Sequence, residues 1–199
     1  MEDRHTVLRY WFGRDPDDPG LAKERASLWW SKAPQTDKEI RERFKPLVLA
    51  AGRGFLGNWK STVHGRLALI LLTDQFPRNI YRGQPQAFAF DGIALELSLK
   101  GLASGEDRLL KPIHRVFFYL PLEHSEVLEH QHRSVDLFQE LVLEVPESRK
   151  QFFAGFLNFA IRHCAIIERF GRFPHRNAIL GRESTPEEVE FLKQPGSSF

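Results

Sequence analysis

The sequence holds a single cysteine, Cys164, among its 199 residues. One thiol cannot form an internal disulfide framework or a metal cluster built from cysteines alone. The longest unbroken apolar run, Leu67 to Leu72, is far shorter than the roughly 20 residues that cross a membrane. The charged start of the chain, Met1 to Arg4, lacks the apolar stretch of a signal peptide. A reducing cytoplasm and no membrane partner are therefore expected.

The chain also lacks a strong excess of charge of either sign. Its formal net charge is +2, from 28 basic and 26 acidic residues, so bulk electrostatics give no reason to expect a nucleic-acid partner. A nucleophile elbow of the Gly-x-Ser-x-Gly type, a glycine-rich phosphate loop and a dinucleotide-binding glycine pattern are all absent from the sequence. No cofactor is expected.

Apolar residues are plentiful, at 42% with 17 Phe and 4 Trp, which is enough for a packed interior. Alternating strand patterns with Asn-Gly hairpin turns are absent. Apolar residues instead recur at helical spacing between short loops that carry Pro, Gly and Asn. The sequence predicts a single all-α domain over residues 1–199 with 194–199 as a loose tail, and two related halves are an alternative organisation.

About nine helices are expected. They are placed at residues 3–12, 19–31, 37–51, 62–76, 86–102, 112–119, 124–144, 147–170 and 186–193. Capping signals mark some of the starts: Thr36 to Glu39 and Thr185 to Glu188 both have the capping-box spacing. Proline opens two helices, at Pro146 and Pro186, because its missing N–H costs nothing at the first helical position.

Ionisable and polar side chains fall on the apolar faces of four of these helices. Residues three, four and seven apart share a face. This spacing points the following residues inward: Asp74, Asp91, His124, Gln131 and His163. A buried carboxylate without a partner costs several kcal/mol, so each aspartate is expected to be ion-paired or hydrogen-bonded.

Two turns of nearly the same sequence supply the expected partners. Phe76 to Ile80 reads FPRNI and Phe173 to Ile179 reads FPHRNAI. Arginine, which recurs in and around both turns, matches carboxylate and phosphate groups with its planar fork. The turns therefore predict a shared polar pocket. The alternative is an internal ion-pair and hydrogen-bond network that fixes the register of the helices.

The favoured hypothesis is a small anionic ligand that carries phosphate or carboxylate. The residues expected to bind it are Arg78, Asn79, Asp91, Arg172, His175, Arg176 and Asn177. If a reaction takes place, His124 or His163 would act as acid or base, with Asp74 orienting it. The sequence does not decide whether the protein is an enzyme. The alternative function is a helical module that binds protein, with exposed hydrophobic surface near the N-terminal aromatic helix.

No metal site is expected. Glu129 and His132 have the Glu-x-x-His spacing of di-iron bundles, but such bundles need the motif on two central helices. The second instance, Glu2 to His5, lies at the extreme N-terminus. Cys164 is interpreted as a small core residue.

Four motifs resemble those of the bacterial family called domain of unknown function 924. They are Tyr10 to Gly13, Asp74 to Asn79, Pro121 to Glu126 and Phe170 to Asn177. The resemblance runs nearly end to end. It implies an all-helical fold of the tetratricopeptide-like superfamily, built from antiparallel helix pairs, and it implies no activity. A 34-residue repeat is not visible, so a regular solenoid with a peptide groove is not expected.

Overall fold

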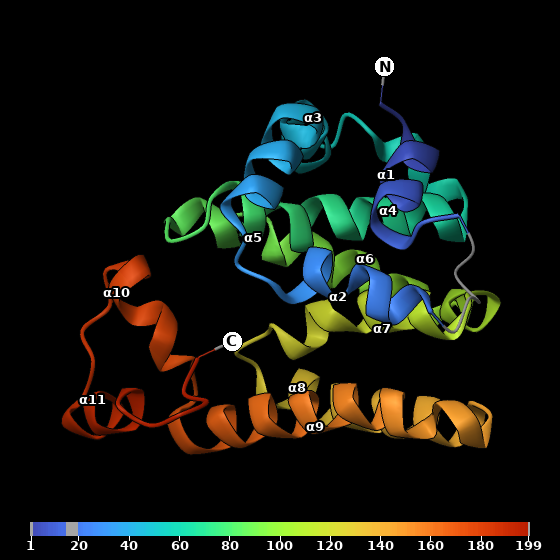
Figure 1. Ribbon diagram of the computed structural model, residues 1–199. Coiled ribbons are helices and arrows are strands. Elements are labelled where there is room, and N and C mark those ends of the chain that lie inside the picture. The colour runs from blue at the N-terminus through green and yellow to red at the C-terminus, as the bar shows by residue number, and fades with distance from the viewer. Residues whose placement is uncertain (1, 15–19, 199) are drawn as a thin grey trace. The chain divides into compact units, whose positions relative to one another are not determined.

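The structure is a computed structural model that describes residues 2–14 and 20–198 (Figure 1). The α-helices are, in chain order, α1 (Arg4–Phe12), α2 (Leu21–Trp30), α3 (Pro34–Gly52), α4 (Val63–Thr73), α5 (Gln75–Ile80), α6 (Asp91–Ala103), α7 (Pro112–Glu123), α8 (Leu128–Glu144), α9 (Glu147–Phe170), α10 (Asn177–Leu180) and α11 (Pro186–Leu192). Short 3₁₀ helices are η1 (Gly57–Ser61), η2 (Pro85–Phe88), η3 (Glu106–Leu109) and η4 (Pro174–Arg176). The described residues contain no β-strand, which confirms the all-α prediction.

Some predicted helix boundaries are wrong. The helix expected over 62–76 ends at Thr73, and α5 begins a separate helix at Gln75. The helix expected over 86–102 is a 3₁₀ turn followed by α6, which starts at Asp91. The helix expected over 124–144 starts only at Leu128. The apolar spacing continues across the points where these helices break. Helical periodicity alone therefore does not reveal the breaks.

The predicted capping boxes have different outcomes. The box at Thr185 is confirmed: its hydroxyl accepts from the Glu188 N–H, and the Glu188 carboxylate accepts from the Thr185 N–H. The box at Thr36 is wrong, because α3 starts two residues earlier, at Pro34. Proline suits the first helical position, so the helix begins there and Thr36 lies inside it. The expected helix start at Glu147, after Pro146, is confirmed.

The chain divides into two compact units. Unit 1 comprises Met1–Arg82 and Gln86–Pro121, and unit 2 comprises Gly83–Pro85 and Leu122–Phe199. The division falls near the end of α7, so most of that helix belongs to unit 1. The predictions of a single domain and of two related halves stay predictions.

Unit 1 is built on an aromatic core. Trp11 is fully buried, and its ring lies 5.3 Å from Phe76 and 5.6 Å from Phe117. Phe44, from α3, lies 5.0 Å from Phe76. Trp30 stacks on Phe117 at 5.8 Å but keeps about half of its surface exposed. The N-terminal aromatic residues thus anchor the core of this unit.

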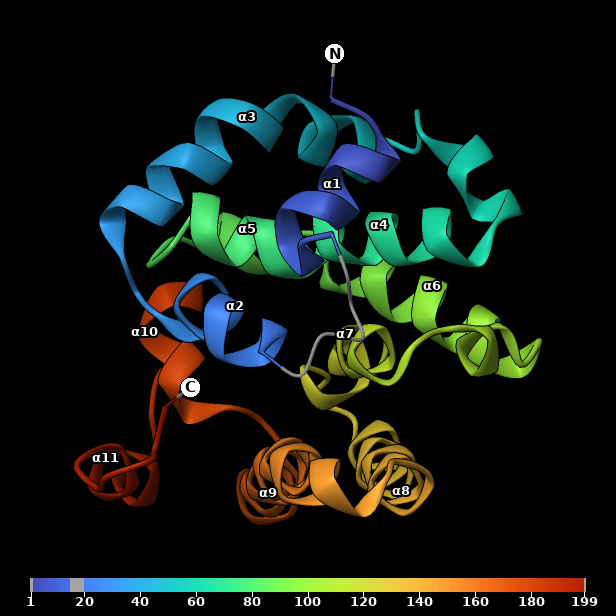
Figure 2. The ribbon, with the colours of Figure 1, turned by 45° about the vertical axis from the view of Figure 1, so that its right-hand side comes forward.

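Unit 2 is built on the pair α8 and α9, which Figure 2 views almost along their axes. The face that α9 buries includes Phe153, Phe156 and Ala160. Phe152 and Phe159, which helical spacing would place on the same stripe as Phe156, are instead 37% and 49% exposed. A pair of packed helices buries only a narrow seam, so a shift of one residue in phase moves these rings to the outside.

The C-terminal part of unit 2 follows a glycine. Gly171 ends α9 with a φ of 65°, a left-handed conformation that glycine adopts without steric cost. The chain then forms η4, α10 and α11. Two residues of the expected loose tail are hydrogen-bonded: Gly196 accepts from Arg162, and Ser197 donates to Leu192. Phe199, the last residue of the expected loose tail, and residue 19, the expected start of the second helix, lie outside the described residues.

None of the helices in the described ranges is long and apolar enough to cross a membrane.

Candidate functional site

The first Phe-Pro segment, expected to be a turn, forms the short helix α5 of unit 1, and its arginine pairs with two aspartates. Arg78 binds Asp91 with both arms of its fork, at 2.9 and 3.0 Å, and lies 3.1 Å from Asp74 Oδ1. Asp74 is completely buried, as expected. Burial lowers the pKa of Arg78, but the two aspartates outweigh it and hold that pKa above its ordinary value. The expected carboxylate partners are therefore present beside this segment.

Asn79, the next residue of this segment, reaches the start of α3. Its side-chain amide donates to Asp37 Oδ1 at 2.9 Å. Arg82 binds both oxygens of the same carboxylate at 2.7 Å. Burial raises the pKa of Asp37, yet the hydrogen bonds from Arg82 and Asn79 bring it below its usual value. Asn79 thus takes part in a helix-joining network of unit 1.

The second Phe-Pro turn, in unit 2, is tied to α11 in a parallel way. Arg172 binds both carboxylate oxygens of Glu188 at 2.7 Å. Asn177 donates to the same carboxylate at 3.3 Å. The hydrogen bonds from Arg172 are the main reason that the pKa of Glu188 falls to about 2, although burial opposes the fall. Both Phe-Pro segments therefore use one Asn and one Arg to hold a carboxylate from a helix start.

Sequence reasoning missed one further ion pair of this turn. Arg182 binds both oxygens of Glu126, at 2.7 and 3.0 Å. The same carboxylate accepts from the backbone N–H of Phe173 at 2.8 Å. Glu126 precedes the first residue of α8, although the sequence predicted a helix from residue 124 onward.

Two histidines and an arginine surround one buried ring of unit 2, and a third histidine lies beside one of them. The ring of Phe173 lies 5.5 Å from His163 and 5.6 Å from His175, and the Arg176 guanidinium carbon lies 4.5 Å from its centre. His124 lies 6.4 Å from His163, ring centre to ring centre. We call these four basic side chains, His124, His163, His175 and Arg176, the imidazole cluster. All four were predicted as site residues.

His163 is the most deeply placed member of the cluster, at 5% exposure. Its Nδ1 lies 2.8 Å from the carbonyl oxygen of Phe159, which can only accept, so Nδ1 carries the proton. The Glu123 carboxylate lies 3.1 Å from the same nitrogen and favours a charged ring. Burial dominates and lowers the pKa of His163 to about 3, and the positive charges of His124 and Arg176 act in the same direction. The ring is neutral at pH 7.

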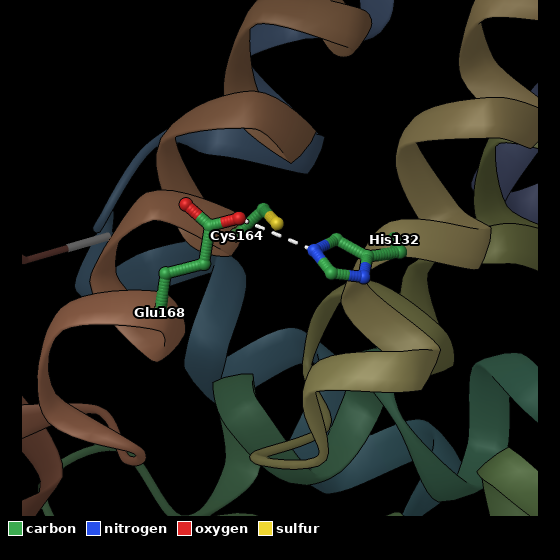
Figure 3. A group of neighbouring side chains, drawn as sticks. All are labelled: His132, Cys164 and Glu168. Atoms are coloured by element: carbon green, nitrogen blue, oxygen red, sulfur yellow. Dashed lines mark hydrogen bonds and ion pairs between the residues drawn. The ribbon is translucent and has the colours of Figure 1, made fainter.

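A separate group of donors lies between α8 and α9. His132 comes from α8, and Cys164 and Glu168 come from α9 (Figure 3). The donor atoms of the three side chains lie within 4.8 Å of one another, and His132 Nε2 lies 3.2 Å from Glu168 Oε1. They line a depression of about 330 Å³, together with Asp136 and three small or apolar residues, Val135, Ile161 and Ala165.

This group does not have the features of an activated nucleophile. Burial raises the pKa of the Cys164 thiol, and the neighbouring Glu168 carboxylate raises it further. A reactive cysteine needs a lowered pKa and cationic neighbours.

The profile of a family described as bacterial protein of unknown function, DUF924, matches residues 7–196. The chain belongs to this family. A solved structure of a protein of unknown function from Agrobacterium tumefaciens is 36% identical in sequence to this DUF924 member. The two align over 96% of each chain with a TM-score of 0.80. No curated protein matches the chain.

The resemblance to DUF924 that the four motifs predicted is thus confirmed. The structure places the predicted site residues of this DUF924 chain in separate groups. In unit 1 lie Asp74, Arg78, Asn79 and Asp91. In unit 2 lie His124, His163, Arg172, His175, Arg176 and Asn177. A pocket common to both groups stays a prediction. The donor group at His132 was missed, because its members come from two helices that sequence spacing cannot bring together.

Proposed function

We propose that the protein binds a small molecule bearing phosphate or carboxylate at the imidazole cluster of unit 2. The observation that carries the proposal is the gathering of His163, His175 and Arg176 around Phe173. His124 lies beside His163, and Glu123 is the carboxylate nearest to His163. Imidazole and guanidinium N–H groups are the donors that suit such anions. His124 and His175 are half-buried, so solvent reaches the edge of the cluster.

Contacts elsewhere in the chain favour this cluster over the other predicted anion binders. Arg78 and Arg172 each hold a carboxylate with two arms of the guanidinium fork. A ligand at either arginine would have to displace a buried or half-buried carboxylate. Arg176 lies against the face of Phe173, in a cation–π arrangement that fixes its orientation.

Binding is a better-supported role for His163 than acid–base catalysis. An efficient general acid or base has a pKa near the working pH, whereas the pKa of His163 is about 3. Asp74, the predicted orienting group, belongs to unit 1, where it lies against Arg78 and accepts from Gln75. The carboxylate beside His163 is that of Glu123. His124, which the sequence predicted as an acid or base, is proposed instead as a donor to the ligand.

A thermal-shift and calorimetric titration with inorganic phosphate, a nucleoside monophosphate and succinate tests the proposal, at pH 7 and constant ionic strength. A ligand that binds only the folded protein raises the melting temperature. We expect His175→Gln and Arg176→Lys to weaken binding by at least about tenfold, since each removes donors while keeping polarity or charge. Arg169→Lys, an exposed arginine at the end of α9, is the matched control and should bind as the wild type does.

If none of the three probes binds at millimolar concentration, or if both cluster variants bind as tightly as Arg169→Lys, the proposal is wrong. Far-UV circular dichroism of each variant separates loss of binding from loss of the fold.

The second candidate is a module that binds another protein, and one observation favours it. Phe152 and Phe159 are seven residues apart on α9, so they lie on the same side of the helix, and both are substantially exposed. The N-terminal aromatic helix, which the sequence favoured for this role, instead buries Trp11 and Phe12. A failed ligand screen would make this surface the next one to test.

A further inference from the structure

The donor group between α8 and α9 contains three different kinds of metal ligand. Imidazole, thiol and carboxylate are contributed by His132, Cys164 and Glu168. Cys164 and Glu168 are four residues apart on α9, so they project from the same face, toward α8. The three donor atoms lie within 4.8 Å of one another.

The spacing is close to what a tetrahedral zinc ion requires. Ligand atoms of such an ion lie about 3.3–3.6 Å from one another, as follows from metal–ligand bonds of about 2.0–2.3 Å. The pair His132 Nε2 and Glu168 Oε1, at 3.2 Å, lies just below this separation. Both side chains are more than half exposed and can rotate, whereas Cys164 is buried and fixed in place. An ion could therefore enter from the solvent side and settle on the thiolate.

A fourth donor is available one turn along α8. Asp136 follows His132 by four residues, and it lines the same depression. The group therefore has two i,i+4 pairs, His132 with Asp136 and Cys164 with Glu168, on two facing helices. The depression, at about 330 Å³, also has room for a water molecule as the fourth ligand.

We propose that His132, Cys164 and Glu168 bind a zinc ion, with Asp136 or a water molecule completing the coordination. One thiolate with imidazole and carboxylate suits zinc, whereas calcium and magnesium prefer oxygen ligands alone. The ion crosslinks α8 to α9. The Glu-x-x-His spacing of Glu129 and His132 plays no part, because the partners of His132 come from the other helix.

Cobalt(II) added to the metal-stripped full-length chain tests the site, because a thiolate ligand gives this ion a charge-transfer absorption in the near ultraviolet. We expect one equivalent of cobalt to produce that band and one equivalent of zinc to remove it. Cys164→Ser should abolish the band. His132→Gln and Glu168→Gln should each weaken zinc binding by at least about tenfold. Zinc should also raise the melting temperature of the wild type.

Glu129→Gln is the matched control, since Glu129 is an exposed carboxylate on α8 outside the donor group. It should bind zinc as the wild type does. Absence of the thiolate band in the wild type overturns the proposal, and so does zinc binding in His132→Gln and Glu168→Gln equal to that of Glu129→Gln. These two substitutions are at exposed positions, so they decide the question even if Cys164→Ser fails to fold. Neither result depends on anion binding at the imidazole cluster.

Discussion

At the scale of single residues, buried ionisable groups of this protein have close polar neighbours. Asp74 has Arg78, Glu188 has Arg172, and His163 has the Phe159 carbonyl. Each is a pairing that the cost of burying charge demands. The sequence indicated which residues are buried, since Asp74 and His163 fall on apolar faces. It could not indicate which partner each would find, because Glu188 and Arg172 are separated by a turn whose path the sequence does not specify.

The lowered pKa of His163 predicts a stability that depends on pH. The unfolded chain has an ordinary value of 6.5 and the folded chain one of about 3, so between these limits the unfolded state binds the extra proton. The free energy of unfolding should therefore fall as the pH drops from about 6.5 toward 3, by at most about 1.4 kcal/mol per pH unit from this group.

Urea unfolding at a series of pH values, with a chelator present, measures this slope. His163→Gln should show a smaller loss of stability between pH 6.5 and 4.5 than the wild type, because its side chain cannot take up a proton. His5→Gln, at an exposed histidine, should keep the slope of the wild type. Equal slopes for His163→Gln and the wild type would contradict the prediction.

At the scale of elements, glycine marks a place where backbone segments touch. Gly65, in the first turn of α4, has no room for a side chain: a Cβ there would lie 2.1 Å from the backbone oxygen of Trp59. The backbone of η1 passes this close because Thr62 caps α4 through the Gly65 N–H. The sequence shows a glycine inside a helical pattern, but the reason for it is a contact that only the structure reveals.

Two glycine-to-alanine substitutions should therefore have opposite effects. Gly65→Ala should lower the free energy of unfolding by about 1–3 kcal/mol, because the methyl group meets backbone that cannot rotate away. Gly155→Ala, in the middle of α9, meets nothing within 4 Å and should raise it by roughly 0.5–1 kcal/mol through better helix propensity. Urea denaturation of both variants checks the signs, and a stabilising Gly65→Ala would refute the close approach.

Helix existence was easier to predict than helix ends. The long helices α8 and α9 follow from apolar spacing that runs over many turns. The break between α4 and α5 does not, because Asp74 and Gln75 are both buried and continue the apolar face. The imidazole cluster lay among the residues predicted from phase and turn chemistry. The proposed zinc ligands were not among the predicted site residues. In the sequence, Cys164 cannot be distinguished from a small core residue, because its position beside His132 is known only from the structure.

At the scale of the whole molecule, the four tryptophans all belong to unit 1, at positions 11, 29, 30 and 59. Tryptophan fluorescence therefore follows the unfolding of unit 1, whereas far-UV circular dichroism follows the helices of both units. A chain of 199 residues that forms one cooperative domain should give coincident transitions by the two methods. We expect this result in urea. A dichroism change that continues after the fluorescence change is complete would show that the units unfold separately.

The single cysteine is also confined to one unit, and this is the unit that has no tryptophan. The lone cysteine belongs to unit 2 and is 94% shielded from solvent, so a bulky thiol reagent reacts with it faster when that part of the molecule opens. The protein thus has two natural reporters: tryptophan fluorescence for unit 1 and the reactivity of the Cys164 thiol for unit 2. The rates at which unit 1 and unit 2 open can be compared without attaching any dye or changing a single amino acid.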